Sequence, residues 1–322
     1  MKIYLTSCLL LLCCYATYAQ QLPHYTQYML NTFIVNPAVA GIENYWDLKA
    51  SHRHQWAGVN GSPVTTYLTL HGPLRKTDYP QASVTGFDPE GANPRGRAYW
   101  ETYTVPPTHA GAGLTILDDH TGPLNRFSAT ATYAHHIGLA PGVSLSAGIS
   151  LGAQRVSLDA SKLDMQDPSD PVIAGSTELG KWRPDVNAGL YLYSSQYFAG
   201  VSMQNIASTP HLFVTGGYRF WLTEDIGMLP SVMIKYIASL PVGVEVNTKF
   251  QYRDKVWLGA SYRHQDGIAA MLGVNVNATF NVSYAYDYTT SSLNLTSKGS
   301  HEILVGILIG NRYADLCPRN IW

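Results

Sequence analysis

From residue 46 to residue 309, apolar and polar residues alternate along one segment of the chain after another. Residues 143–154 are the clearest case, with Leu145 and Leu151 on one parity and Ser146 and Ser150 on the other. Successive side chains of a β-strand point to opposite faces, so each segment predicts a strand between an apolar and a polar environment. The chain is therefore expected to be all-β.

Soluble β-sandwiches and membrane β-barrels both produce this alternation, and the composition separates them. Charged residues make up 13% of the 322 residues, whereas soluble domains usually have about 25%. The polar faces carry Ser, Gly, Asn, Gln and Tyr in place of Lys and Glu. The apolar faces carry aromatic residues near the strand ends, namely Phe127, Tyr133, Tyr252, Tyr262, Tyr286 and Tyr288. Together these features favour an antiparallel transmembrane β-barrel facing outer-membrane lipid.

Composition also excludes other classes. The net charge is −1, from 21 basic and 22 acidic residues, so no nucleic-acid partner is expected. No apolar run long enough for a membrane helix follows the first twenty residues.

Fourteen alternating segments are counted, which suits a barrel whose two ends meet on one side. Four connections are tight and share one side, expected to be periplasmic: 139–142, 195–196, 253–254 and 277–278. The longer connections 156–183 and 289–300 then lie outside. Segment 72–109 is long but falls on the periplasmic side. It is either an insertion or contains an extra hairpin, formed by 81–87 and 97–105, which raises the count to sixteen.

The ends of the chain lie outside the alternating part. Residues 1–19 resemble a secretory signal peptide, with Lys2 before an apolar stretch and small residues at the expected cleavage site. Residues 20–45 do not alternate, and a short helix is expected there, in the lumen or at the periplasmic mouth. The barrel spans 46–309 and the tail 310–322.

Charged residues within the strands share the parity of the polar face. They are Asp47, Lys49, Arg53, Glu245, Lys249, Arg253, Arg263, Asp287 and Glu302. A bare Arg or Lys facing lipid costs about 2–4 kcal/mol near the midplane, so these side chains are expected to face the lumen. Because both signs are nearly balanced, they predict a paired network that plugs the barrel. A diffusion pore is the alternative, although its lining more often shows one sign.

No residue pattern predicts catalysis, a cofactor or a metal site. Gly175 to Lys181 resembles part of a phosphate-binding loop, but Trp182 stands where Ser or Thr is needed. A scattered Ser/His hydrolase site is the remaining enzymatic alternative. Four acidic residues cluster in the outer connection: Asp159, Asp164, Asp167 and Asp170. They are interpreted as turn formers that contact a secreted protein, with calcium binding as an open alternative.

Several motifs together resemble the PorP/SprF family of type IX secretion system membrane proteins. Near the start they are Gln27-Tyr28-Met29-x-Asn31, Asn36-Pro37-Ala38-x-Ala40-Gly41 and Arg53-x-Gln55-Trp56-x-Gly58. Further along they include Gly111-x-Gly113-Leu114, Gly189, Gly200-Val201-Ser202 and Ser300-His301-Glu302-Ile303. Segment 78–107 departs from the pattern, since the family usually passes more directly from the second strand to the third.

The resemblance implies a non-enzymatic outer-membrane component or accessory of type IX secretion. Such a protein assists export or surface retention of a large secreted protein, such as a gliding adhesin. Its implied partners are periplasmic ring proteins, an outer-membrane lipoprotein, and the C-terminal signal domain of the secreted protein. The residues assigned to partner docking are Asn36, Pro37, Gly41, Gln55, Trp56, Cys317 and Trp322. A solute channel is the alternative function, and the resemblance does not distinguish a core component from a cargo-specific paralogue.

Overall fold

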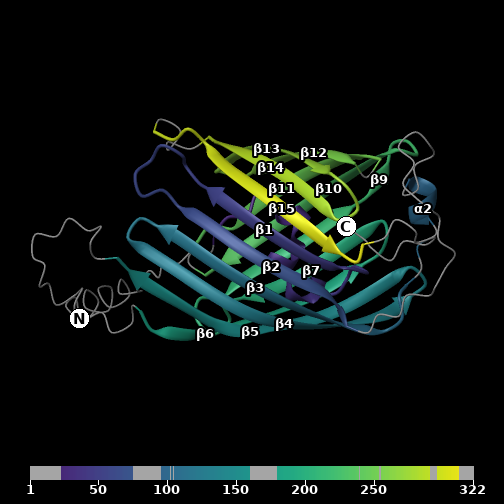
Figure 1. Cartoon of the computed structure of the whole chain (residues 1–322), viewed down its shortest axis with the longest axis horizontal. Coiled ribbons are helices and arrows are strands. Elements are labelled where there is room, and N and C mark those ends of the chain that lie inside the picture. The colour runs from purple at the N-terminus through teal and green to yellow at the C-terminus, as the bar shows by residue number, and fades with distance from the viewer. Residues whose placement is uncertain are drawn as a thin grey trace, which may run out of the picture.

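The computed structural model describes residues 23–74, 96–101, 103, 105–159, 180–238, 240–253, 255–290 and 296–311. It is a closed antiparallel barrel of fourteen strands, in which β1 pairs with both β2 and β15, and β10 pairs with β11 (Figure 1). The first seven strands are β1 Trp46–His54, β2 Val64–Leu74, β3 His109–Thr121, β4 Leu124–Ala140, β5 Val143–Leu158, β6 Trp182–Tyr193 and β7 Tyr197–Gln204. The others are β8 His211–Tyr218, β10 Ile226–Ile237, β11 Gly243–Tyr252, β12 Val256–Arg263, β13 Gly267–Asn275, β14 Phe280–Thr289 and β15 Ser300–Ile309.

A fifteenth strand, β9 (Phe220–Trp221), is only two residues long and extends the wall beyond β8 along β10. The fourteen-strand prediction is confirmed. The sixteen-strand alternative is wrong, because β2 pairs directly with β3 and residues Arg97–Glu101 form a helix, α2. Residues 81–87 lie outside the described part of the chain.

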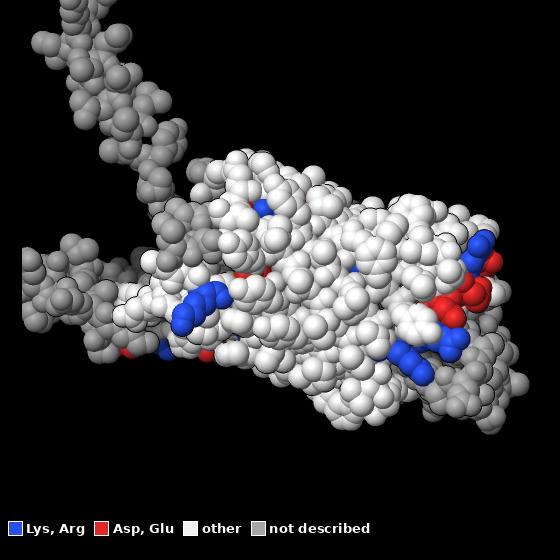
Figure 2. All heavy atoms as spheres, turned by 90° about the horizontal axis from the view of Figure 1, so that it is seen from above, with Lys and Arg blue, Asp and Glu red and all other residues white. Residues whose placement is uncertain are grey.

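The two faces of the barrel follow the alternation of the sequence. On β5, Ser146 and Ser150 are buried in the lumen, while Leu151 on the opposite parity is 55% exposed. Figure 2 shows a broad middle surface with very few charged side chains, and charges gathered at the end that carries α2. The outward aromatic residues expected at the interfaces include Tyr133 and Tyr262, both about half exposed.

The N-terminal residues form three short 3₁₀ turns in place of the single short helix expected there. They are η1 (Tyr28–Leu30), η2 (Thr32–Ile34) and η3 (Pro37–Val39). Pro37 fixes its own backbone and keeps Asn36 extended, so a continuous helix cannot form through this point. The Asn36 side chain instead caps η3 by accepting a hydrogen bond from the Ala38 amide at 3.0 Å. Among the described residues, no helix is long and apolar enough to cross a membrane.

The barrel has two distinct ends. The tight connections that follow β4, β6, β11 and β13 lie at one end, hereafter the short-turn end, together with α2. The connections that follow β1, β3, β5 and β14 lie at the other, hereafter the long-loop end. Antiparallel pairing of each strand with the next produces this separation.

Candidate functional site

Residues 23–45 lie inside the barrel and run from the long-loop end to the short-turn end, where β1 begins. Thr26, Gln27, Ala38 and Ala40 are completely buried there. Two parts of this segment contact the wall in different ways. Residues 23–30 are hereafter the arm, and residues 36–41 are the anchor.

The anchor lies directly on glycines of the wall. A Cβ on Gly111 of β3 would overlap the Ala40 carbonyl oxygen, and one on Gly148 of β5 would lie 2.5 Å from the Ala38 nitrogen. A Cβ on Gly189 of β6 would overlap the Asn36 side chain. At Gly111 and Gly148 backbone meets backbone, so even one added methyl group has no room there.

Gly41 ends the anchor in a conformation that favours glycine, with φ of +83°. A Cβ at this position would also lie 2.5 Å from Cα of Gly111. The Gly41–Gly111 contact therefore needs glycine on both sides, which gives a physical reason for two glycines that the sequence motifs contain.

Hydrogen bonds from the wall satisfy the anchor's carbonyl groups. Ser146 Oγ donates to the Ala38 oxygen and His136 Nε2 to the Ala40 oxygen, each at 2.7 Å. Asn36 Nδ2 donates to the Leu190 oxygen at 3.0 Å. His109 lies flat against His136, with ring centroids 4.5 Å apart. The anchor is thus fixed both by shape and by hydrogen bonds to several strands.

The arm is held by side chains that reach inward from the wall. Thr26 Oγ1 donates to Asp287 Oδ2 at 2.7 Å and accepts from Arg53 Nη1 at 2.6 Å. The Thr26 amide donates to Glu302 Oε2 at 3.0 Å. Arg263 Nη2 donates to Thr26 Oγ1 at 3.3 Å. Thr26 therefore lies at the centre of four charged side chains.

These charged side chains also form ion pairs that, with Glu245, join five strands. Arg53 of β1 lies 2.6 Å from Asp287 of β14 and 3.3 Å from Glu302 of β15. Arg263 of β12 lies 3.2 Å from Glu245 of β11 and 3.6 Å from Asp287. The structure therefore brings five of the charged residues singled out in the sequence into one cluster, hereafter the charge cluster.

Asp266, in the turn after β12, joins the charge cluster by accepting from Arg263 Nη1 at 2.9 Å. His24 of the arm is half-buried near the same cations. Burial, together with the charges of Arg263, Lys235 and Arg53, lowers the pKa of His24 well below its ordinary value. His24 is therefore neutral at neutral pH.

Asp47 and Lys49 form a separate pair nearer the short-turn end. Their side chains are 2.6 Å apart, and Lys49 also donates to the carbonyl oxygen of Leu30 at the end of the arm. His71 lies 3.8 Å from Asp47 and contacts the ring of Phe33. Lys49 therefore contacts the end of the arm, and His71 contacts the residues between the arm and the anchor.

Two residues expected in the charge network lie elsewhere. Lys249 lines a cavity of about 120 Å³ near the short-turn end, together with Lys49, Arg219 and Trp257. Arg253 lies just after the end of β11 and adopts a φ of +50°. Its Nε donates to Asp225 at 3.1 Å. The Arg253 partner, Asp225, is not a member of the charge cluster.

The residues assigned to partner docking occupy three separate regions. Asn36, Pro37 and Gly41 are buried in the anchor. Gln55 and Trp56 lie in the β1–β2 connection at the long-loop end, where the Trp56 amide donates to Ser300 Oγ at 3.0 Å. Cys317 and Trp322 lie outside the described residues. The anchor residues therefore have a packing role inside the barrel.

Only one member of the acidic group in the outer connection is described. Asp159 follows the end of β5, and its amide donates to the Pro123 carbonyl oxygen at 2.7 Å. Asp164, Asp167 and Asp170 lie outside the described residues. Within the described part of the chain, no group of three or more His, Cys, Asp or Glu side chains is arranged to hold a metal ion.

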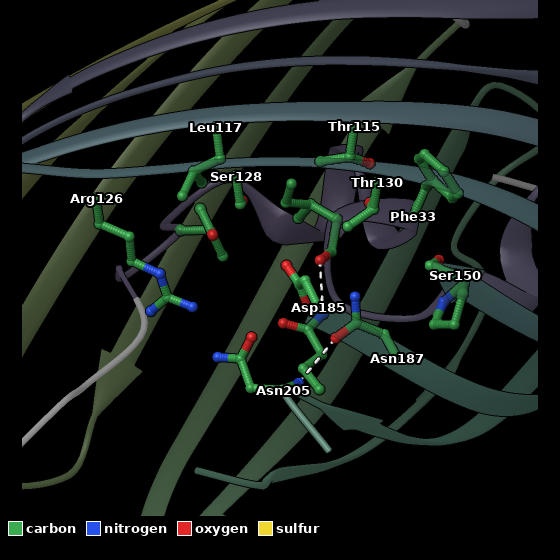
Figure 3. A pocket seen from close by; sticks show the side chains of 14 residues that line it. Phe33, Thr115, Leu117, Arg126, Ser128, Thr130, Ser150, Asp185, Asn187 and Asn205 are labelled. Atoms are coloured by element: carbon green, nitrogen blue, oxygen red, sulfur yellow. Dashed lines mark hydrogen bonds between the residues drawn. The ribbon is translucent and has the colours of Figure 1, made fainter. Parts of the chain in front are cut away.

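A polar cavity of about 50 Å³ lies between the N-terminal segment and the wall (Figure 3). Arg126 lies at one side, and Asp185 projects among the amides of Asn187 and Asn205. Asp185 is only 5% exposed, and no ion pair joins it to Arg126 among the described contacts. The volume suits a few water molecules, each of which needs about 10–15 Å³.

Sequence reasoning missed the central residue of the site. Thr26 lies in a segment without periodicity, and its partners are separated from it by more than 200 residues in the chain, apart from Arg53. The sequence did predict that Arg53, Asp287 and Glu302 face inward. Because a cluster of inward charges requires polar partners, these three residues were the signal that could have led to Thr26.

The sequence matches one known family. A sequence model of the family described as "Type IX secretion system membrane protein PorP/SprF" matches residues 17–307. No curated protein matches the chain. Among solved structures, it is similar to the Acinetobacter baumannii outer membrane protein Omp33, with 8% identity, a TM-score of 0.46, and coverage of 84% of this chain and 100% of that one. It is also similar to the Ralstonia pickettii toluene transporter TbuX, with 8% identity, a TM-score of 0.47, and coverage of 87% and 93%.

Proposed function

The chain belongs to the PorP/SprF family of type IX secretion system membrane proteins and is an integral outer-membrane protein, and we propose that it assists export or surface retention of a large secreted protein. A gliding adhesin is the kind of cargo expected. The chain does this through protein contacts, without catalysis. Its proposed partners are periplasmic ring proteins, an outer-membrane lipoprotein, and the C-terminal signal domain of the cargo.

The filled lumen is the observation that supports this proposal most. The arm and the anchor occupy the lumen along its length, and the charge cluster closes around the arm. A solute channel needs a continuous aqueous path. A barrel filled by its own N-terminal segment is better suited to act through its ends.

Planar-bilayer recordings test the choice between this role and a solute channel. The purified full chain is expected to give no steady conductance steps. Deletion of its gene is expected to reduce the amount of one large protein on the cell surface. Stable conductance in the unaltered chain, with a normal set of surface proteins in the deletion strain, would favour the channel.

The long-loop end is the proposed contact surface for cargo. We place it outside the cell because the opposite end carries the tight turns. The acidic group Asp159, Asp164, Asp167 and Asp170 belongs to this surface in the proposal. Deleting residues 159–171 should leave a folded, heat-modifiable barrel but remove cargo from the cell surface. Normal retention of cargo in this variant would indicate that the cargo contact lies at the short-turn end.

The tail is the proposed contact for the secretion machinery. It follows β15 at the short-turn end, which it shares with α2. Crosslinking from Cys317 in intact cells should yield an adduct with a second protein, such as a periplasmic or lipoprotein component. A thiol that reacts only after denaturation, without any adduct, would identify the tail as a packing element.

A further inference from the structure

The arm contacts the barrel as a bound peptide contacts its receptor. The wall recognises its backbone and side chains together: the Thr26 amide donates to Glu302, and Gln27 Nε2 donates to the Glu302 carbonyl oxygen at 3.1 Å. Tyr28 accepts from Asn247 Nδ2 at 2.7 Å, and the ring of Tyr25 meets Tyr67 edge-on at 5.5 Å. Successive residues of the arm therefore have individual partners on the wall.

The charge cluster does not need the arm for its own pairing. Arg53 pairs with Asp287 and Glu302, and Arg263 pairs with Glu245 and Asp266, all within the wall. Removing one partner from a buried ion pair is costly because a charge is left unpaired. Withdrawal of the arm removes only Thr26 and Gln27 groups from the cluster, so each Arg keeps a carboxylate. The site is preformed.

The cluster favours an occupant without acidic residues. Four carboxylates, from Glu245, Asp266, Asp287 and Glu302, surround Arg53, Arg263 and the nearby Lys235. Acceptors are therefore in excess, and they suit the amide and hydroxyl donors of a polypeptide segment such as the arm. The sequence of the arm and its flanks, residues 20–31, contains no Asp or Glu.

We propose that the long-loop half of the lumen is a binding site for a non-acidic polypeptide segment that turns as the arm does and has Ser or Thr at its centre. In the structure the arm fills this site in cis. A segment from a partner polypeptide can replace it while the anchor keeps the N-terminal segment attached to the wall. This inference goes beyond the secretion role, because the site can exist whether or not the chain takes part in export.

The test uses the full chain with Thr26→Asp. A carboxylate at this position cannot donate to Asp287 as the Thr26 hydroxyl does. It also adds a fifth acidic group where four carboxylates already outnumber three cations, so it should release the arm. The probe is a fluorescent synthetic peptide with the sequence of residues 20–31, and binding is followed by anisotropy. The Thr26→Asp barrel should bind the probe saturably, at least about tenfold more tightly than the unaltered chain or the matched Thr26→Ser control. A probe that itself carries Thr26→Asp should bind at least about tenfold more weakly.

A folded Thr26→Asp barrel that binds neither probe, or binds both equally, would overturn the proposal. If that variant does not fold, the arm can be displaced in the chain with native Thr26. A His24→Cys chain in a Cys317→Ser background reports release of the arm by maleimide labelling. The unaltered peptide in excess should accelerate labelling several-fold, and the Thr26→Asp peptide should not. Equal labelling rates with both peptides would also overturn the proposal.

Discussion

The arm and the anchor belong to one short segment inside one barrel, yet the wall holds them by different physical means. The anchor lies against Gly111, Gly148 and Gly189, where no added atom fits. The arm is separated from its strands by long side chains such as Arg53 and Glu302, which bridge the gap through hydrogen bonds. Close packing tolerates almost no displacement. Polar contacts can be exchanged for others, so the two ends of the segment should differ in mobility.

The largest expected effect comes from breaking the anchor. Gly111→Val places a branched side chain where the Ala40 carbonyl lies. Overpacking usually costs about 1–3 kcal/mol, and the overlap with backbone puts this variant at or beyond the upper limit. We expect loss of the heat-modifiable barrel on gel electrophoresis, or a large drop in its melting temperature.

Gly216 provides the matched control for this experiment. It also lies in a strand, β8, but a Cβ there approaches only the Phe198 oxygen, at 3.6 Å. The melting temperature of Gly216→Ala should be close to that of the unaltered chain. A Gly111→Val barrel as stable as Gly216→Ala would show that the anchor is not locked by contact with the wall.

Breaking the charge cluster should have the next largest effect. Arg53→Met leaves Asp287 and Glu302 buried without their main cation. Loss of one partner from a buried pair costs about 3–5 kcal/mol. Adding Glu302→Gln should restore part of the lost stability, because it removes one of the stranded charges. Equal melting temperatures for Arg53→Met and the unaltered chain would count against a paired cluster.

A smaller effect is expected from pH, through His24 of the arm. The pKa of His24 is lowered when the arm is docked, by burial and by Arg263, Lys235 and Arg53. Docking of the arm is therefore most stable above the ordinary His pKa of about 6.5. It weakens as the pH falls from about 6.5 toward the lowered pKa that His24 has in the docked arm.

Maleimide labelling of the arm at a Gln27→Cys position, in a Cys317→Ser background, should therefore be faster at pH 5 than at pH 8 once each rate is divided by that of a free thiol at the same pH, because only the thiolate reacts. His24→Gln in the same background should remove most of this pH dependence, because glutamine does not titrate. If labelling of the His24→Gln chain changes with pH as much as before, another group controls docking of the arm.

The strands and the inward charges were predictable because lipid imposes a simple rule on the sequence. A charge facing lipid is costly, so Arg53, Asp287 and Glu302 had to point inward, and the structure places them there. The rule failed for Arg253, because parity holds only while the chain is a strand. At Arg253 the β11–β12 turn has begun, and a φ of +50° reverses the direction of the chain.

The contents of the lumen were not predictable in the same way. The three turns between residues 28 and 39 have no periodicity, so nothing in the local sequence assigns Thr26 to Asp287 or the anchor to Gly148. The motif glycines could be identified in the sequence. The contacts that require glycine at these positions, however, join parts of the chain that are far apart in the sequence. Residues 97–101 resembled part of a hairpin by pattern and form α2.

Hydrogen–deuterium exchange of the full chain in detergent tests the central claim most directly, because it compares the two parts within one molecule. Residues 25–29 of the arm and residues 38–41 of the anchor are all buried, and the wall holds the two parts by different contacts. Local opening sets their exchange rates. The account predicts that arm amides exchange at least about tenfold faster than anchor amides, and that Thr26→Val widens this difference. Equal protection of both parts, or faster exchange in the anchor, would contradict it.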